Sequence, residues 1–278
     1  MRRFIIHLLQ FLIIPIFCLI VSFFSKSEIE KKRELLNKTR ESHNIIIMGD
    51  SKSVANYNYK ILKNNFPNHN IINTFIWAKN PQFNYSVYQD VLKNKKIKNS
   101  IVIYNATYRH LLNKSNKEWK KWNFKAKIDA LLGNTHKFKH TRSENGFINN
   151  LEQDFKAKKF GVAFYKSLET KYEPNFSTQI SYLVKLQDLI EKDSSNLLLI
   201  ADLPYDSIVN QIYSNSEYYS IYKKHMHADF EKNTLNFNYM PGLNNTKYWF
   251  NHDHLHYLGA KAFTPIFCDS LRKKIKTP

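Results

Sequence analysis

Short apolar runs alternate with longer segments of mixed polar and apolar residues through most of the chain. The apolar runs predict strands at 45–48, 70–76, 100–105, 196–202 and, more weakly, 235–240. The mixed segments predict helices at 54–63, 81–93, 177–191 and 214–233. Alternation of this kind is typical of a parallel sheet with helices on both faces. The sequence therefore predicts an α/β domain with a five-stranded parallel sheet over residues 44–278.

The first predicted strand ends at a glycine and is followed by a serine. Residues 45–53 read Ile-Ile-Ile-Met-Gly-Asp-Ser-Lys-Ser, and a helix-forming segment begins at Val54. In open α/β sheets, sites lie at the carboxyl edge of the strands, where this ending exposes a hydroxyl group. Ser51 is therefore the candidate nucleophile, although Gly-Asp-Ser is also ordinary turn chemistry.

A second polar block lies near the other end of the chain. Residues 249–260 read Trp-Phe-Asn-His-Asp-His-Leu-His-Tyr-Leu-Gly-Ala. An Asp three residues before a His lets the carboxylate hold one ring nitrogen while the other faces a hydroxyl, as acyl transfer requires. Asp253 and His256 fit these roles, and His254 is the alternative base.

Together, the early Gly-Asp-Ser and the late Asp-x-x-His resemble the SGNH/GDSL hydrolase superfamily. That family carries Gly-Asp-Ser on strand one and Asp-x-x-His after strand five. The resemblance implies a three-layer, flavodoxin-like α/β fold, with Ser51, His256 and Asp253 as nucleophile, base and orienting carboxylate. It favours His256 over His254 because the family writes Asp-x-x-His just before a helix that opens with Gly-x-x, and Gly259 follows His256 closely.

The resemblance also implies an oxyanion hole. In the family, the backbone N–H of the nucleophile, here Ser51, works with a Gly after strand two and an Asn after strand three. This chain has no Gly after strand two, so a backbone donor would come from near Trp77 or Ala78. Asn105 stands at the Asn position without the family's Gly-x-Asn-Asp spelling, and it also suits a strand-end turn. Trp77 and Lys52, beside these blocks, are the predicted substrate contacts.

The chain begins with an apolar run at 4–24, after Met1-Arg2-Arg3. At about 1.5 Å per residue this run spans a hydrocarbon core of about 30 Å. It predicts a transmembrane anchor at 1–25, followed by a charged juxtamembrane stalk at 26–43. A cleaved signal peptide is the alternative, but no small-x-small site follows the run. Basic residues flank both sides and slightly favour a cytoplasmic body, whereas the family resemblance favours the extracytoplasmic side that we expect.

Residues 107–173 exceed what a five-stranded sheet needs. They are basic and aromatic and contain helix-like pieces near 118–132 and 147–160. An insertion between strands three and four lies above the carboxyl edge of the sheet, where it can form a wall of the substrate site. The alternative is a solvated helical excursion with no contact to the site.

The composition and charge of the chain limit which binding partners we expect. The formal net charge is +19 over 278 residues, but the lysines are spread along the whole chain without a nucleic-acid-binding motif. We therefore expect that the protein does not bind nucleic acid, and anionic lipid headgroups or acidic polymers suit the charge better as partners.

The closely spaced histidines do not predict a metal site. His252, His254 and His256 alternate, yet the metal-binding pattern His-x-His-x-Asp-His would need Asp at 256 and His at 257, so we expect no metal and no cofactor. The only cysteines are Cys18 in the anchor and Cys268, which excludes a disulfide within the domain.

Within the superfamily, the anchor and the two blocks look most like the membrane-anchored branch that modifies cell-envelope polymers. Alginate O-acetylation proteins and the D-alanine transfer protein of teichoic acids belong to it. The resemblance implies that Ser51 takes an acyl group, expected to be acetyl, from a multi-pass membrane O-acyltransferase and passes it to a polysaccharide hydroxyl. Hydrolysis uses the same acyl-serine, so we predict a membrane-anchored serine acyltransferase or esterase. The alternatives are a non-catalytic SGNH-like scaffold that binds glycan or a membrane partner, and a membrane-tethered protein of other chemistry.

Overall fold

The computed structural model describes residues 34, 35, 38, 43–74, 80–92, 97–111, 163, 165–167 and 176–276. The predicted anchor at 1–25 lies outside these residues, as do most of the predicted stalk at 26–43 and most of the predicted insertion at 107–173. No helix in the described part of the chain is both long and apolar enough to cross a bilayer.

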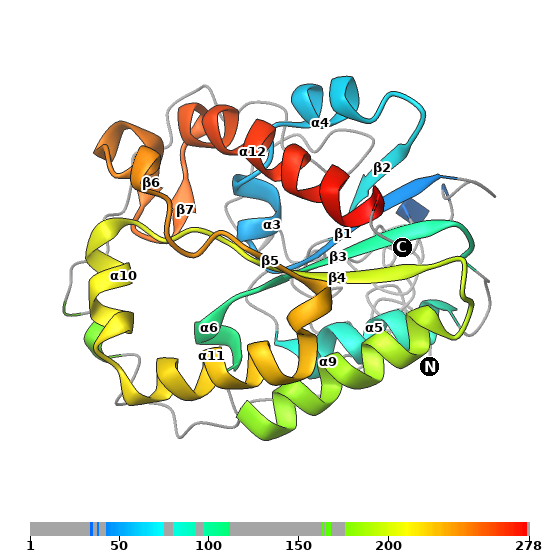
Figure 1. Ribbon diagram of the computed structural model, residues 1–278, viewed down its shortest axis with the longest axis horizontal. Helices are drawn as coiled ribbons and strands as arrows, with labels where there is room; N and C mark the ends of the chain where they lie inside the picture. The colour runs from blue at the N-terminus through cyan, green and yellow to red at the C-terminus, as the bar shows by residue number, and fades with distance from the viewer. Residues whose placement is uncertain are drawn as a thin grey trace, which may run out of the picture.

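Five parallel strands form the centre of the domain in the order β2-β1-β3-β4-β5 (Figure 1). Their bounds are β1 Asn44–Gly49, β2 Asn70–Asn73, β3 Ser100–Ala106, β4 Leu197–Asp202 and β5 Thr234–Asn236. This order is that of a flavodoxin-like doubly wound sheet. The predicted α/β class and five-stranded parallel sheet are therefore confirmed, and the fold is consistent with an SGNH-like domain.

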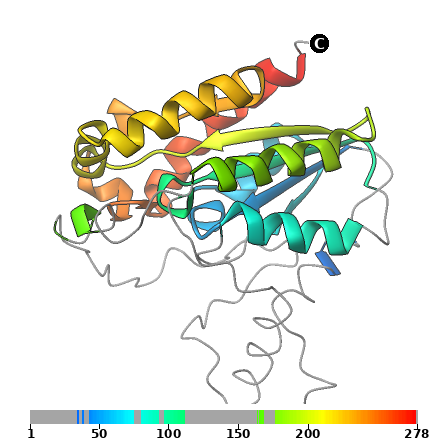
Figure 2. The same ribbon diagram turned by 90° about the horizontal axis from the view of Figure 1, so that it is seen from below.

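Helices cover both faces of the sheet, because successive strand residues point to opposite sides. On one face, Ile46 and Val102 pack against α5 (Pro81–Leu92), α9 (Phe176–Glu191) and α11 (Glu217–Phe230). On the other face, Ile47 and Ile103 pack against α4 (Tyr59–Asn65) and α12 (Tyr257–Lys276). Figure 1 shows α5 and α9 beneath the sheet and α12 above it, and Figure 2, seen from below, shows α5 and α9 side by side. The result is the three-layer arrangement that the alternating pattern predicts.

Two predicted helices are each interrupted by capping residues. The segment 54–63 forms α3 (Lys52–Ala55) and α4, and α4 starts where the Asn58 side chain accepts the backbone N–H of Ile61 (3.1 Å). The segment 214–233 starts at the last residue of α10 (Ser207–Ser214) and continues, after a break at 215–216, as α11, where the Ser216 side chain accepts the N–H of Tyr219 (3.3 Å). A short 3₁₀ turn, η1 (Glu231–Asn233), and the shorter fifth strand follow.

The last part of the chain folds back over the carboxyl edge of the sheet. After η2 (Pro241–Leu243) and η3 (Thr246–Tyr248), an antiparallel hairpin of β6 (Trp249–Asn251) and β7 (His254–Leu255) leads into α12. Gly259 fixes the start of this helix, because a Cβ there would lie 2.1 Å from the carbonyl oxygen of Tyr248. The close approach packs α12 against η3, directly before the hairpin.

We expect Gly259→Ala to lower the free energy of unfolding by about 2 kcal/mol or more, since the neighbouring atom is a backbone oxygen that cannot rotate away. Gly242→Ala is the matched control, because a Cβ at Gly242 meets nothing within 4 Å. Urea unfolding of the two purified full-length variants, followed by circular dichroism, measures the difference. Equal unfolding midpoints would contradict the tight contact at Gly259.

Candidate active site

The candidate nucleophile follows a turn that only glycine allows. β1 ends at Gly49, whose φ of +128° is one that L side chains rarely adopt. An added Cβ would also lie 2.8 Å from the carbonyl oxygen of Asn105 on β3. The chain can therefore turn sharply and begin α3 at Lys52, with Ser51 as its N-cap residue. This places the serine at the carboxyl end of β1, next to the central strand β3.

Hydrogen bonds hold this turn on several sides. Asp50 Oδ1 accepts the backbone N–H two residues further on (2.9 Å), and Ser53 Oγ donates to the carbonyl of Met48 (3.2 Å). Asn73, the last residue of β2, donates its side-chain amide to the carbonyl of Ser53 (2.7 Å). Because these bonds fix the main chain around it, the Ser51 side chain is presented from a rigid support.

Ser51, His254 and Asp253 form a series of two hydrogen-bond contacts, which we call the relay. Ser51 Oγ lies 2.7 Å from Nε2 of His254, and Nδ1 of the same ring lies 2.7 Å from Oδ1 of Asp253. The carboxylate favours the tautomer in which Nδ1 carries the proton, which leaves Nε2 to accept the serine hydroxyl. The serine and the carboxylate are buried, and the imidazole between them is partly buried. This is the order of nucleophile, base and orienting group that acyl transfer requires.

The structure corrects the predicted base, because His256 does not face Ser51. His256 directly precedes α12: its backbone N–H donates to the carbonyl of Tyr248 (2.7 Å), and its carbonyl accepts the N–H of Ala260 (2.8 Å). Its Nδ1 is buried and has no hydrogen bond to a described residue. The prediction relied on the spacing i, i+3, whereas residues 249–255 form a hairpin whose turn places Asp253 beside the ring of His254.

Asn251 is a site residue that the sequence reasoning missed. Its Oδ1 accepts the backbone N–H groups of Asp253 (3.1 Å) and His254 (2.8 Å), which shapes the hairpin turn. The same oxygen lies 3.0 Å from Nδ1 of His254. Asn251 stands three residues before His254, which is the position that Asp occupies in the Asp-x-x-His pattern. The amide oxygen thus stands where the family pattern has a carboxylate, and Asp253 supplies the charge.

Asn105, a predicted oxyanion donor, instead supports the turn. Its Nδ2 donates to Ser53 Oγ (2.7 Å), and its Oδ1 accepts the hydroxyl of Tyr57 (2.7 Å). No hydrogen bond joins Asn105 to Ser51, both of which the structure describes. The other predicted oxyanion residue, Ala78, and the predicted substrate contact Trp77 lie outside the described residues, so their roles stay predictions.

Lys52, the other predicted substrate contact, is buried in the protein with 1% of its surface exposed. Its Nζ donates to the carbonyl of Pro204 (3.1 Å) and lies 3.3 Å from the centre of the Tyr205 ring. Burial raises the pKa of the nearby Asp202 carboxyl, and the positive charges of Lys223 and Lys52 partly oppose this shift. Lys52 therefore ties α3 to the segment after β4, and its ammonium group is not available to a substrate.

One residue of the predicted insertion reaches the site. Tyr165 is fully buried, and its hydroxyl donates to Oδ1 of Asp253 (3.4 Å). Its ring lies edge-on to the imidazole of His252, with 5.6 Å between ring centres. Tyr165 therefore contacts the site, while the role of the rest of the insertion, most of which lies outside the described residues, stays a prediction.

Within the described ranges, no group of three or more His, Cys, Asp or Glu side chains is arranged to hold a metal ion. His225 and His227, two closely spaced histidines on α11, pair with Asp229 of the same helix (3.5 Å) and with Glu231 of η1 (3.7 Å).

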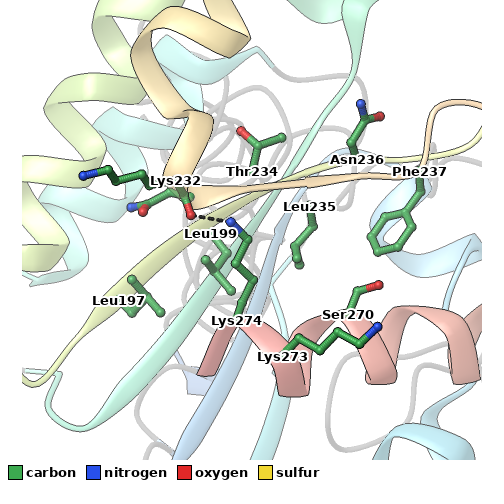
Figure 3. A pocket seen from close by; sticks show the side chains of 11 residues that line it. Leu197, Leu199, Lys232, Thr234, Leu235, Asn236, Phe237, Ser270, Lys273 and Lys274 are labelled. Atoms are coloured by element: carbon green, nitrogen blue, oxygen red, sulfur yellow. Dashed lines mark hydrogen bonds between the residues drawn. The ribbon is translucent and has the colours of Figure 1, made fainter. Parts of the chain in front are cut away.

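A groove of about 690 Å³ lies away from the serine, along β5 and the C-terminal part of α12 (Figure 3). Its floor is apolar, and lysines stand at its rim, as the sticks in Figure 3 show. The residues concerned are Leu197, Leu199, Leu235, Phe237, Lys232, Lys273 and Lys274. None of the residues that line this groove belongs to the Ser51 site.

The sheet and the serine relay together define an α/β protein with a Ser–His–Asp site at the carboxyl edge of its sheet. Residues 162–276, less than half of the chain, match the model of an uncharacterised family. Among solved structures, the chain is similar to a two-domain esterase (CEX) active on acetylated mannans and co-crystallized with mannopentaose, with a TM-score of 0.39 and 11% sequence identity. The alignment covers 90% of this chain and 54% of that one, so the chain spans about half the length of that esterase. No curated protein matches the sequence.

The relay predicts which histidine activates the serine. We expect His254→Ala to reduce labelling of Ser51 by a fluorophosphonate probe by roughly 100-fold or more, because the base is lost. His256→Ala is the matched control and should label at nearly the wild-type rate. Labelling rates read from gel fluorescence compare the two variants. Loss of labelling in His256→Ala with retention in His254→Ala would overturn this assignment.

Proposed function

We propose that the chain is a membrane-anchored serine acyltransferase or esterase that acts on an envelope polysaccharide through an acyl-serine intermediate. The observation that carries the proposal is the relay from Ser51 through His254 to Asp253, with both contacts at 2.7 Å. The relay lies at the carboxyl edge of a parallel sheet, where open α/β folds place their active sites.

In the first half of the proposed reaction, Ser51 Oγ attacks the carbonyl carbon of the acyl donor. His254 Nε2 takes the hydroxyl proton, and the resulting imidazolium is stabilised by Asp253 and held in plane by Asn251. The backbone N–H of Ser51 is the proposed first donor to the oxyanion. When the tetrahedral intermediate collapses, His254 returns the proton to the leaving oxygen, and the acyl group stays on Ser51.

In the second half, a hydroxyl group attacks the acyl-serine while His254 again takes the proton. A sugar hydroxyl gives O-acylation, and water gives hydrolysis. Both outcomes use the same intermediate, and the exclusion of water by the acceptor decides between them. We propose acetyl as the acyl group, an envelope polysaccharide as the acceptor and a multi-pass membrane O-acyltransferase as the donor. These assignments are supported by the sequence resemblance and the predicted anchor at 1–25.

A non-catalytic scaffold that binds glycan or a membrane partner is the second candidate. It is favoured by the hydrogen bonds of Asn105, which run to Ser53 and Tyr57 and leave the oxyanion without that side chain. Folded wild-type protein that fails to react with a fluorophosphonate would favour the scaffold over the enzyme.

The proposed chemistry predicts an acetyl-enzyme. We expect the wild type to hydrolyse p-nitrophenyl acetate and to carry acetyl on Ser51 after rapid acid quenching, as detected by peptide mass spectrometry. Asp253→Asn should lower kcat by roughly 10³-fold or more, because the amide no longer favours the required tautomer. Ser51→Ala should abolish the adduct and the turnover. Undiminished turnover in Ser51→Ala would show that another group performs the reaction.

The proposed substrate requires the domain to face outward. We expect alkaline phosphatase fused after Pro278 to be active in whole cells and β-galactosidase fused at the same position to be inactive. The opposite pattern would place the domain in the cytoplasm, as the flanking basic residues slightly favour, and would remove envelope glycans as substrates while leaving the serine relay intact.

A further inference from the structure

A second Asp–His pair lies beside the relay. Nδ1 of His252 is hydrogen-bonded to Oδ2 of Asp206, and the backbone N–H of Asp206 donates to the carbonyl of His252 (3.2 Å). The two side chains are 18% and 12% exposed. Asp206 is thus hydrogen-bonded to His252 through both its main chain and its side chain. By contrast, the His225–Asp229 pair on α11 is 38% and 37% exposed and links neighbouring turns of one helix.

Asp206 is itself held in place. Its Oδ1 accepts the backbone N–H of Val209 (2.8 Å) and so caps α10. The two carboxylate oxygens therefore have separate tasks, one at the helix and one at the imidazole. Val209 is fully buried. The capped helix gives the hairpin a rigid attachment point.

Tyr165 completes the contacts around the turn. Its ring lies edge-on to His252, while its hydroxyl donates to the Asp253 oxygen that also faces His254. His252 is followed directly by Asp253 and His254 in the chain. Any rotation of the main chain at His252 would therefore displace Asp253 and His254, the two members of the relay that lie in the hairpin.

We propose that His252 is a positioning residue: clamped by Asp206 and Tyr165, it fixes the hairpin turn so that Asp253 meets Nδ1 of His254 while Nε2 meets Ser51. The inference rests on the proposed function for its catalytic consequence, but its structural part stands alone. The backbone bond from Asp206 sets the position of the turn. The bond to the imidazole and the tyrosine ring set its orientation.

The activity test separates orientation from folding. Asp206→Asn keeps an oxygen that can cap α10 and keeps the backbone N–H, but it replaces the carboxylate that holds the ring. We expect kcat for p-nitrophenyl acetate to fall roughly 10-fold in Asp206→Asn and in His252→Ala, with KM changed less than about 2-fold. His252→Asn, whose amide nitrogen lies near the position of Nδ1, should recover most of the rate. The double variant Asp206→Asn/His252→Ala should be no worse than His252→Ala, since the pair acts as a unit.

A second readout does not depend on activity. In full-length protein with ¹⁵N-labelled histidine, the His254 Nδ1–H proton held by Asp253 should give a downfield resonance that is lost or broadened in His252→Ala. The resonance should persist in the control His225→Ala, which removes an exposed His–Asp pair. Persistence in His252→Ala as well, or kcat unchanged in both Asp206→Asn and His252→Ala, would overturn the inference. If the wild type is inactive but the resonance is lost only in His252→Ala, the positioning role stands and the proposed function fails.

Discussion

The hydrogen bond between Ser51 and His254 joins residues 203 positions apart, and the rest of the site depends on it. It forms because the chain breaks between α3 and α4. Asn56, at this break, accepts the backbone N–H of Leu255 in the hairpin (3.3 Å), and the backbone N–H of Asn58 donates to Thr264 Oγ1 on α12 (2.9 Å). The segment beside the nucleophile thus receives both the hairpin and the last helix. A continuous helix there would have left these polar groups without their distant partners.

Much of the fold could be predicted because buried parallel strands read as apolar runs. The runs around Ile46, Val102 and Ile200 are the three strands at the middle of the sheet, and their sequences admit little else. The breaks within 54–63 and 214–233 were missed because asparagine and serine are tolerated inside helices as well as at their ends. Their capping role depends on what lies opposite them. Asn56 and Asn58 meet residues some two hundred positions later, and no local pattern shows such partners.

The candidate site, like the fold, has some residues that could be predicted from the sequence and others that could not. Ser51 could be predicted because a glycine and a strand end fix its place, and Asp253 because a charge beside histidines has few other uses. The choice between His254 and His256 could not be predicted, since it depends on whether residues 249–255 form the start of a helix or a hairpin. Lys52 and Asn105 have the chemistry of ligand contacts, yet both are used inside the scaffold. Asn251 could be recognised as a site residue only once His254 was identified as the base. Tyr165 and Asp206 had no sequence signal that tied them to the histidines.

The distance along the chain between the two partners has a consequence during synthesis. Ribosomes add about 5–20 residues per second, so the 203 residues that separate Ser51 from His254 take about 10–40 s to make. Until then the nascent polypeptide carries an alcohol without a base, and its nucleophilicity stays that of an ordinary serine. Under the proposed acyl-transfer function, the late synthesis of the hairpin therefore withholds the reactivity of Ser51 until the fold is nearly finished. A prematurely terminated product that stops short of residue 254 would contain the residues of all five parallel strands but lack the imidazole that contacts Ser51.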